Sequence, residues 1–189
     1  MISSLVNRIK NDLKDCQIDW KVALGFIPIA FFTYLFHEFG HWIVGEILGN
    51  DMIISLNNSS ARNGNYINDS HNLYISIGGP AFTLLLALIF LVLTKKTKSI
   101  YAYSVVFFAA FSRFFSIVFG GFCLQDEARI SALLNINMYA TAIIVLFLLI
   151  LIVFRSSIIM KLDLKAVGYF VTLSTLTILL VIGINELIG

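Results

Sequence analysis

The sequence predicts an all-α polytopic membrane protein with about five transmembrane helices and a short β-hairpin at the membrane edge. Three observations predict this fold class. Of the 189 residues, 59% are hydrophobic and only 13% are charged, and the mean hydropathy is +0.90, which does not fit the surface of a soluble domain. The apolar residues fall in five long runs that are separated by short polar or basic segments. The one long polar segment, residues 50–72, carries strand and turn signals.

Charge and cysteine content narrow the class of protein further. The net charge of +2 is too small to favour a nucleic-acid partner, and the basic residues are spread between the apolar runs. Two cysteines, Cys16 and Cys123, do not make a disulfide framework. We therefore expect a multi-pass protein of the cell membrane that is surrounded by membrane lipids and binds no nucleic acid.

Residues 1–20 predict an amphipathic helix that lies on the membrane surface. Apolar residues recur there at helical spacing, and charged residues fall between them. The apolar positions are Ile2, Leu5, Val6, Ile9 and Leu13. No continuous apolar core follows the basic residues closely and no small-residue cleavage site is evident, so we do not expect a secretory signal.

The first apolar run, residues 22–48, is long enough to cross a membrane and contains the HExxH motif His37-Glu38-Phe39-Gly40-His41. Residues four apart share a face of a helix, so His37 and His41 can bind one metal ion while Glu38 reaches a water beside it. Ionisable groups at bilayer depth are unfavourable unless they pair or bind something. The motif therefore predicts one zinc ion per chain, with Glu38 as the catalytic base.

Residues 50–72 change character, because Asn, Ser, Asp and Gly replace the apolar residues. Residues 52–56 are strand-like, Asn63-Gly64 is a hairpin turn signal, and residues 65–67 can return as a second strand. We expect a small hairpin here, with a simple connecting loop as the alternative.

The second run, residues 73–94, contains Gly78-Gly79-Pro80 near its beginning. Two adjacent glycines remove side chains where another backbone or a substrate comes close, and a proline tolerates a helix start or break. These three residues are candidates for substrate binding or support, although helix packing alone also explains them. Thr83 in the same run and Arg113 in the next run belong to the same set of candidates.

The third run, residues 100–122, carries Arg113 near its middle, where an unpaired guanidinium is unfavourable. We expect Arg113 to face protein, with Glu46 or the acidic pair Asp126-Glu127 as its counter-ion. A structural salt bridge is its expected role.

A charged segment, residues 122–129, follows the third run and offers a third ligand for the zinc. A carboxylate completes a two-histidine site and leaves the fourth position for water. Asp126 is the expected ligand, and Glu127 and His71 remain alternatives.

Two further apolar runs, residues 138–154 and 166–184, read as lipid-facing support helices. No repeat or linker is visible. We expect one membrane-embedded domain over residues 1–189, with a catalytic core over 22–135 and support helices over 137–188.

The assembled pattern resembles the site-2 protease family of intramembrane zinc metalloproteases. The HExxH segment from His37 to His41 matches the family's metal-binding helix, Gly78-Gly79-Pro80 is similar to its glycine-glycine-proline segment, and Asp126 falls where its third ligand comes. Two features differ. Members often have Asn three residues after that proline, where this chain has Thr83, and their third ligand often lies in Leu-Asp-Gly, where this chain has Leu124-Gln125-Asp126-Glu127.

The resemblance implies zinc-dependent hydrolysis of peptide bonds in or near transmembrane segments or short hydrophobic peptides. Glu38 would accept a proton from water and pass it to the leaving amine. An unwound substrate segment could add to the hairpin as an extra strand. The alternative is a non-catalytic membrane protein that binds or transports a metal, but a base beside the metal does not favour it.

The basic residues predict how the chain is oriented in the membrane. With five spans, ten of them lie on the side of the amino terminus and two on the side of the hairpin. The first group is Arg8, Lys10, Lys14, Lys21, Lys95, Lys96, Lys98, Arg155, Lys161 and Lys165, and the second is Arg62 and Arg129. Short cytoplasmic loops carry an excess of Lys and Arg, so we expect a cytoplasmic amino terminus and an outward-facing hairpin. Site-2 proteases usually open their site toward the cytosol, which is the opposite expectation.

Overall fold

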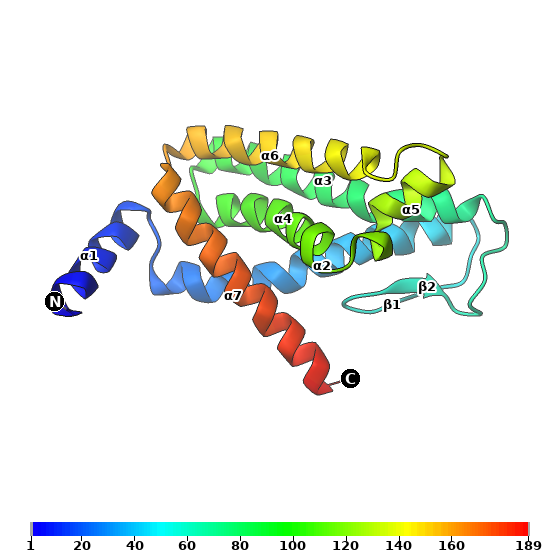
Figure 1. Cartoon of the computed structure of the whole chain (residues 1–189), viewed down its shortest axis with the longest axis horizontal. Coiled ribbons are helices and arrows are strands. Elements are labelled where there is room, and N and C mark those ends of the chain that lie inside the picture. The colour runs from blue at the N-terminus through cyan, green and yellow to red at the C-terminus, as the bar shows by residue number, and fades with distance from the viewer. Residues whose placement is uncertain (1, 189) are drawn as a thin grey trace.

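Every predicted apolar run folds as a long α-helix in the computed structural model of the chain (Figure 1), which describes residues 2–188 and the side chains of residues 7 and 9–184. The elements are α1 (Ile2–Asp15), α2 (Trp20–Ile47), β1 (Met52–Ile54), β2 (Ser59–Ala61), α3 (His71–Thr97), α4 (Ile100–Phe119), the 3-10 turn η1 (Phe122–Leu124), α5 (Asp126–Leu133), α6 (Ala140–Met160) and α7 (Leu164–Ile188). Five of these helices, α2, α3, α4, α6 and α7, are long and apolar enough to cross a membrane. The predicted class, an all-α multi-pass membrane protein with a small β-hairpin, is confirmed.

The amino-terminal helix is shorter than the predicted residues 1–20, because α1 ends at Asp15 and α2 already begins at Trp20, and part of its predicted apolar face cannot be followed. Met1, Gly189 and the side chains of Ile2, Leu5 and Val6 lie outside the described residues. Further along α1, Leu13 packs against a core cluster that includes residues of α7.

α3 and α6 extend beyond their predicted ends. The prediction ended each span at its first charged residue, but each helix ends where the backbone adopts a capping conformation. α3 continues through Lys95 and Lys96 and stops at Lys98, and α6 continues past Arg155 and stops at Lys161. Both terminating lysines adopt the left-handed conformation that closes a helix, with φ of 54° and 57°. Pro80 lies inside α3, so it neither starts nor breaks that helix as the sequence suggested.

The hairpin exists, but its second strand lies earlier than the sequence predicted. β1 pairs antiparallel with β2, with Met52 opposite Ala61. The chain turns at residues 55–58, where the Ser55 amide and hydroxyl both donate to the Asn58 carbonyl oxygen. This register buries Met52 and Ala61 together against Ile75 of α3, and Tyr66 of the predicted second strand packs on the same cluster without forming a strand.

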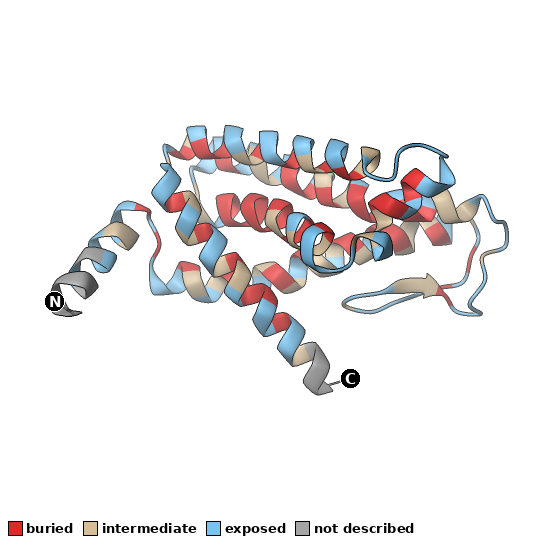
Figure 2. Cartoon of the chain, viewed as in Figure 1, coloured by how far each residue is buried: buried red, intermediate tan, exposed pale blue. Residues whose placement is uncertain are grey.

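The enclosure of α4 and the close contact of α2 with α3 position the candidate site residues. α4 is the most enclosed span, because 61% of the residues in its most apolar 18-residue stretch are buried. Figure 2 shows buried residues along α4, whereas α6 exposes its outer face. α2 and α3 approach each other closely at Gly40 and Gly78, where a Cβ on either glycine would meet the backbone of the other helix. Small residues permit such backbone contacts between membrane helices.

The two ends of the helix bundle carry different charge. Figure 1 shows α1 and the α3–α4 and α6–α7 connections at one end, with the hairpin and α5 at the other. The basic residues at the carboxyl ends of α3 and α6 therefore lie at the end opposite the hairpin, as the predicted topology requires.

A cysteine at Asn63, an exposed residue on the hairpin side, tests the predicted orientation. The exposed Cys123 is first changed to Ser, while Cys16 can stay because it is only 3% exposed. We expect Asn63→Cys to react with a membrane-impermeant maleimide in intact cells, and Lys96→Cys to react only after the cells are opened. The reverse pattern would place the hairpin in the cytoplasm.

Candidate metal centre

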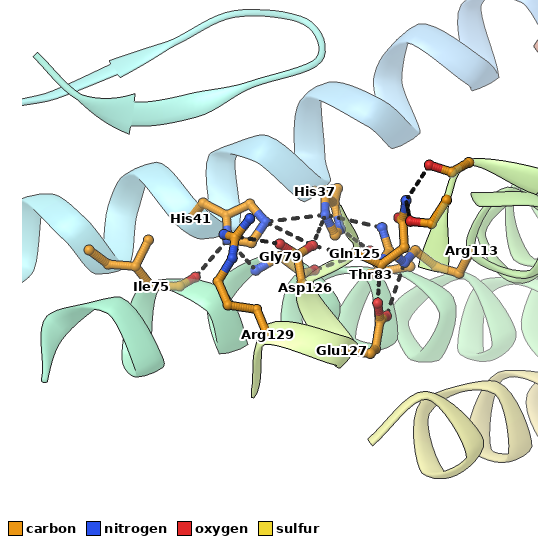
Figure 3. Close-up of polar contacts among 12 residues, drawn as sticks. His37, His41, Ile75, Gly79, Thr83, Arg113, Gln125, Asp126, Glu127 and Arg129 are labelled. Carbon is orange, nitrogen blue, oxygen red and sulfur yellow. Dashed lines mark hydrogen bonds and ion pairs between the residues drawn. The ribbon is translucent and has the colours of Figure 1, made fainter. Parts of the chain in front are cut away.

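Three predicted ligands from two helices converge on one point (Figure 3). His37 and His41 project from the same face of α2, and Asp126 projects from the first turn of α5. His37 Nε2 lies 3.1 Å from Asp126 Oδ2, His41 Nε2 lies 3.3 Å from the same oxygen, and the two ring nitrogens are 3.2 Å apart. Within the described residues, these three form the group that could hold a metal ion.

The other ring nitrogens of the two histidines are fixed by a stripe of α3 residues spaced four apart, Ile75, Gly79 and Thr83. The Thr83 hydroxyl donates to the Gly79 carbonyl oxygen at 3.1 Å, so its lone pairs accept the hydrogen bond from His37 Nδ1 at 2.9 Å. His41 Nδ1 donates to the Ile75 carbonyl oxygen at 2.6 Å. These partners assign the proton of each neutral ring to Nδ1 and leave both Nε2 lone pairs directed at Asp126.

This donor set fits a divalent cation. With each ring proton on Nδ1, two ring lone pairs and a carboxylate oxygen meet at 3.1 to 3.3 Å from one another. A cation bound between them would satisfy all three acceptors at once. Two imidazoles and one carboxylate are a ligand set that zinc accepts.

Gly79 makes room for the two imidazoles. A Cβ at this position would collide with His41 Nε2 and would lie 2.6 Å from both Cε1 and Nε2 of His37. The neighbouring Gly78 serves the helix contact with Gly40 instead. The two glycines of the predicted segment therefore have different tasks, one in helix packing and one beneath the ligands.

Gly79→Ala is expected to lower metal affinity by about 10- to 100-fold, because the added methyl group displaces both ligand rings. Metal content and affinity of the purified variant measure this effect. Gly168→Ala on α7 is the matched control, since nothing lies within 4 Å of a Cβ there and its affinity is expected to match the parent. Unchanged affinity in Gly79→Ala would contradict the role of this glycine.

Glu38 lies beside the ligands in a cavity of about 460 Å³ that also contains His37, His41 and Asp126. Its side chain is partly buried and makes no hydrogen bond to the part of the chain that the structure describes. Glu38 is therefore free to bind a molecule in the cavity.

The alternatives for the third ligand are engaged elsewhere. Glu127 is fully buried and accepts two hydrogen bonds from Arg113. Glu127 is therefore the counter-ion of Arg113, as one of the two predicted alternatives. His71 contacts the amide of Asn50 through Nδ1 at 3.2 Å. Glu46, the other candidate counter-ion, accepts a hydrogen bond from the Met52 amide.

Two walls of the cavity were not predicted. α5 contributes Arg129, and α7 contributes Ile178 and Val181, although the sequence of α7 reads only as a lipid-facing support helix. The hairpin, which the sequence analysis links to substrate, contributes residues 56–59. These contacts join residues far apart in the chain. Thr83, a candidate support residue from the sequence, follows Gly79 by four residues, so the two share a helix face.

The fold and the site together define a multi-pass membrane protein with a candidate metal centre at one end of its helix bundle. Comparison of the chain with protein-family models, curated proteins and solved structures gave no match.

Proposed function

We propose that this protein is an intramembrane zinc metalloprotease of the site-2 protease type in the cell membrane. Its substrates would be transmembrane segments or short hydrophobic peptides. The observation that carries the proposal is the convergence of His37 Nε2, His41 Nε2 and Asp126 Oδ2 beside Glu38 in one cavity of a five-span membrane protein.

The ligand set that would hold the metal is His37, His41 and Asp126. When bound, zinc supplies Lewis acidity, which polarises a peptide carbonyl and makes a water molecule a better nucleophile at neutral pH. Glu38 takes one proton from that water as the hydroxyl adds to the carbonyl carbon. Glu38 then gives the proton to the amide nitrogen as the C–N bond breaks, which leaves a carboxylic acid and an amine.

The surroundings of Glu38 suit a peptide in extended form. A helical substrate keeps its carbonyl groups hydrogen-bonded, so a segment must unwind before water can attack it. The cavity is bounded by residues 56–59 of the hairpin, and Ser59 has a buried hydroxyl with no hydrogen-bond partner among the described residues. An unwound segment could pair with the hairpin as an added strand, and its polar atoms could satisfy such groups.

Incubation of the purified protein with a panel of single-span peptides tests the proposed function. We expect cleavage in the presence of zinc, and loss of cleavage after treatment with a chelator that returns when zinc is restored. Mass spectrometry of the products locates the cut. Metal binding without chelator-sensitive cleavage of any peptide would favour the alternative, a non-catalytic protein that binds or transports a metal.

A further inference from the structure

Arg113 of α4 is held rigidly at the edge of the candidate metal centre (Figure 3). Only 7% of its surface is exposed. The fully buried Glu127 accepts hydrogen bonds from Arg113 Nε at 3.2 Å and from Nη2 at 2.5 Å. A two-point contact of this kind fixes the plane of the guanidinium group.

The third guanidinium nitrogen, Nη1, is directed at the site instead of at Glu127. It lies 3.3 Å from His37 Nε2, and the neighbouring Nη2 lies 3.6 Å from Asp126 Oδ2. Since His37 Nδ1 donates to Thr83, its Nε2 carries the lone pair that accepts from Nη1. The same lone pair is the one that a metal ligand must offer.

Arg113 Nη1 and a cation therefore compete for one nitrogen of His37. When a cation holds that nitrogen, Nη1 loses this partner, and a buried charged N–H without an acceptor is unfavourable. The two nearby carboxylates lie on other atoms: Glu127 is bonded to the other side of the guanidinium, and Asp126 faces Nη2 through Oδ2 and Arg129 through Oδ1. Arg113 lines the cavity that contains Glu38, so an oxygen atom of a molecule in that cavity is the acceptor within reach.

We propose that Arg113 is a catalytic residue that binds the carbonyl oxygen of the peptide bond being cut. Its guanidinium stabilises the negative charge that this oxygen gains as water adds to the carbonyl carbon. Glu127 is a positioning residue, since it holds the guanidinium with Nη1 toward the cavity. This role rests on the proposed peptide hydrolysis and goes beyond the structural salt bridge that the sequence predicts for Arg113.

The double variant Arg113→Gln/Glu127→Gln removes the guanidinium without leaving a buried charge unpaired, because the two amides can bond to each other. We expect it to bind zinc at least as tightly as the parent, since nothing then competes for His37 Nε2. Its kcat for a cleaved single-span peptide is expected to fall by about 100-fold or more while KM changes less than about threefold. A second variant, Arg113→Lys, keeps the charge but lacks the fork that reaches both Glu127 and the cavity, and a similar loss in kcat is expected.

Binding of N-phosphoryl-leucinamide to the cobalt-loaded protein provides a readout other than activity. This compound carries a tetrahedral anionic group, so its affinity is expected to fall in both variants by about the same factor as kcat. Arg155→Gln changes an exposed arginine on α6 and serves as the matched control, with both quantities unchanged.

Retained kcat and retained phosphoryl-compound affinity in the metal-loaded variants would overturn the proposal. A loss of kcat that only follows a loss of metal would also overturn it, because the role would then be structural. If the parent cleaves no peptide, the proposed function fails, but the comparison of phosphoryl-compound affinity still tests whether Arg113 binds an anionic oxygen in this cavity.

Discussion

Glu38→Gln is expected to abolish peptide cleavage and to leave the fold and the metal in place. The glutamine side chain has nearly the same shape but cannot take a proton from water, and the loss of a general base lowers a rate by at least about 100-fold. Glu38 is not among the three converging ligands, so metal content is expected to stay at one ion per chain. Cleavage rates and metal analysis of the same preparation measure both effects.

Glu46→Gln is the matched control for this variant. Glu46 lies on the same helix, and its contact is an accepted hydrogen bond from the Met52 amide, which a glutamine oxygen can also accept. We expect its cleavage rate to remain within about twofold of the parent, since no reacting group is changed. Equal cleavage by Glu38→Gln and the parent would remove Glu38 from the mechanism.

Alanine at any one of His37, His41 or Asp126 is expected to remove the metal and, with it, the activity. Each supplies one of three converging ligand atoms, so the loss of affinity should exceed the roughly 10- to 100-fold effect typical of groups that only support a ligand. Metal content after dialysis and metal affinity by titration measure this loss.

His71→Ala and Glu127→Gln separate Asp126 from the alternative third ligands. Both are expected to retain the metal, since His71 contacts Asn50 and Glu127 contacts Arg113 instead of the site. Full metal content in Asp126→Ala, together with loss of metal in either of these variants, would mean that the third ligand is wrongly assigned.

The membrane spans could be predicted from the sequence because a bilayer requires long apolar helices, and this requirement is local. The hairpin was predicted less well. The Asn63-Gly64 signal is a real turn, with Gly64 at a φ of 77°, but it does not join the two strands. The register depends on burying Met52 and Ala61 against α3, which is a contact between segments distant in the chain.

The candidate site likewise combines residues that local spacing predicts with residues whose roles depend on contacts between distant segments. His37, Glu38 and His41 could be placed together because their spacing alone puts them near one another on a helix. Asp126 and Glu127 are adjacent and chemically alike, so the sequence could not separate their contacts. Arg113 on α4 separates them, because it binds Glu127 and leaves Asp126 directed at the histidines.

The contact between Gly40 and Gly78 bears on how freely this sequence can change. The spacing between α2 and α3 at the site is set by main-chain atoms in contact, and no side-chain rotamer can alter such a contact. The exposed outer residues of α6, such as Ile143 and Phe147, take no part in that contact. Substitutions among apolar residues can therefore accumulate over the lipid-facing surface while α3 keeps its position beside α2, and with it the Ile75 and Thr83 oxygens that orient the two histidine rings.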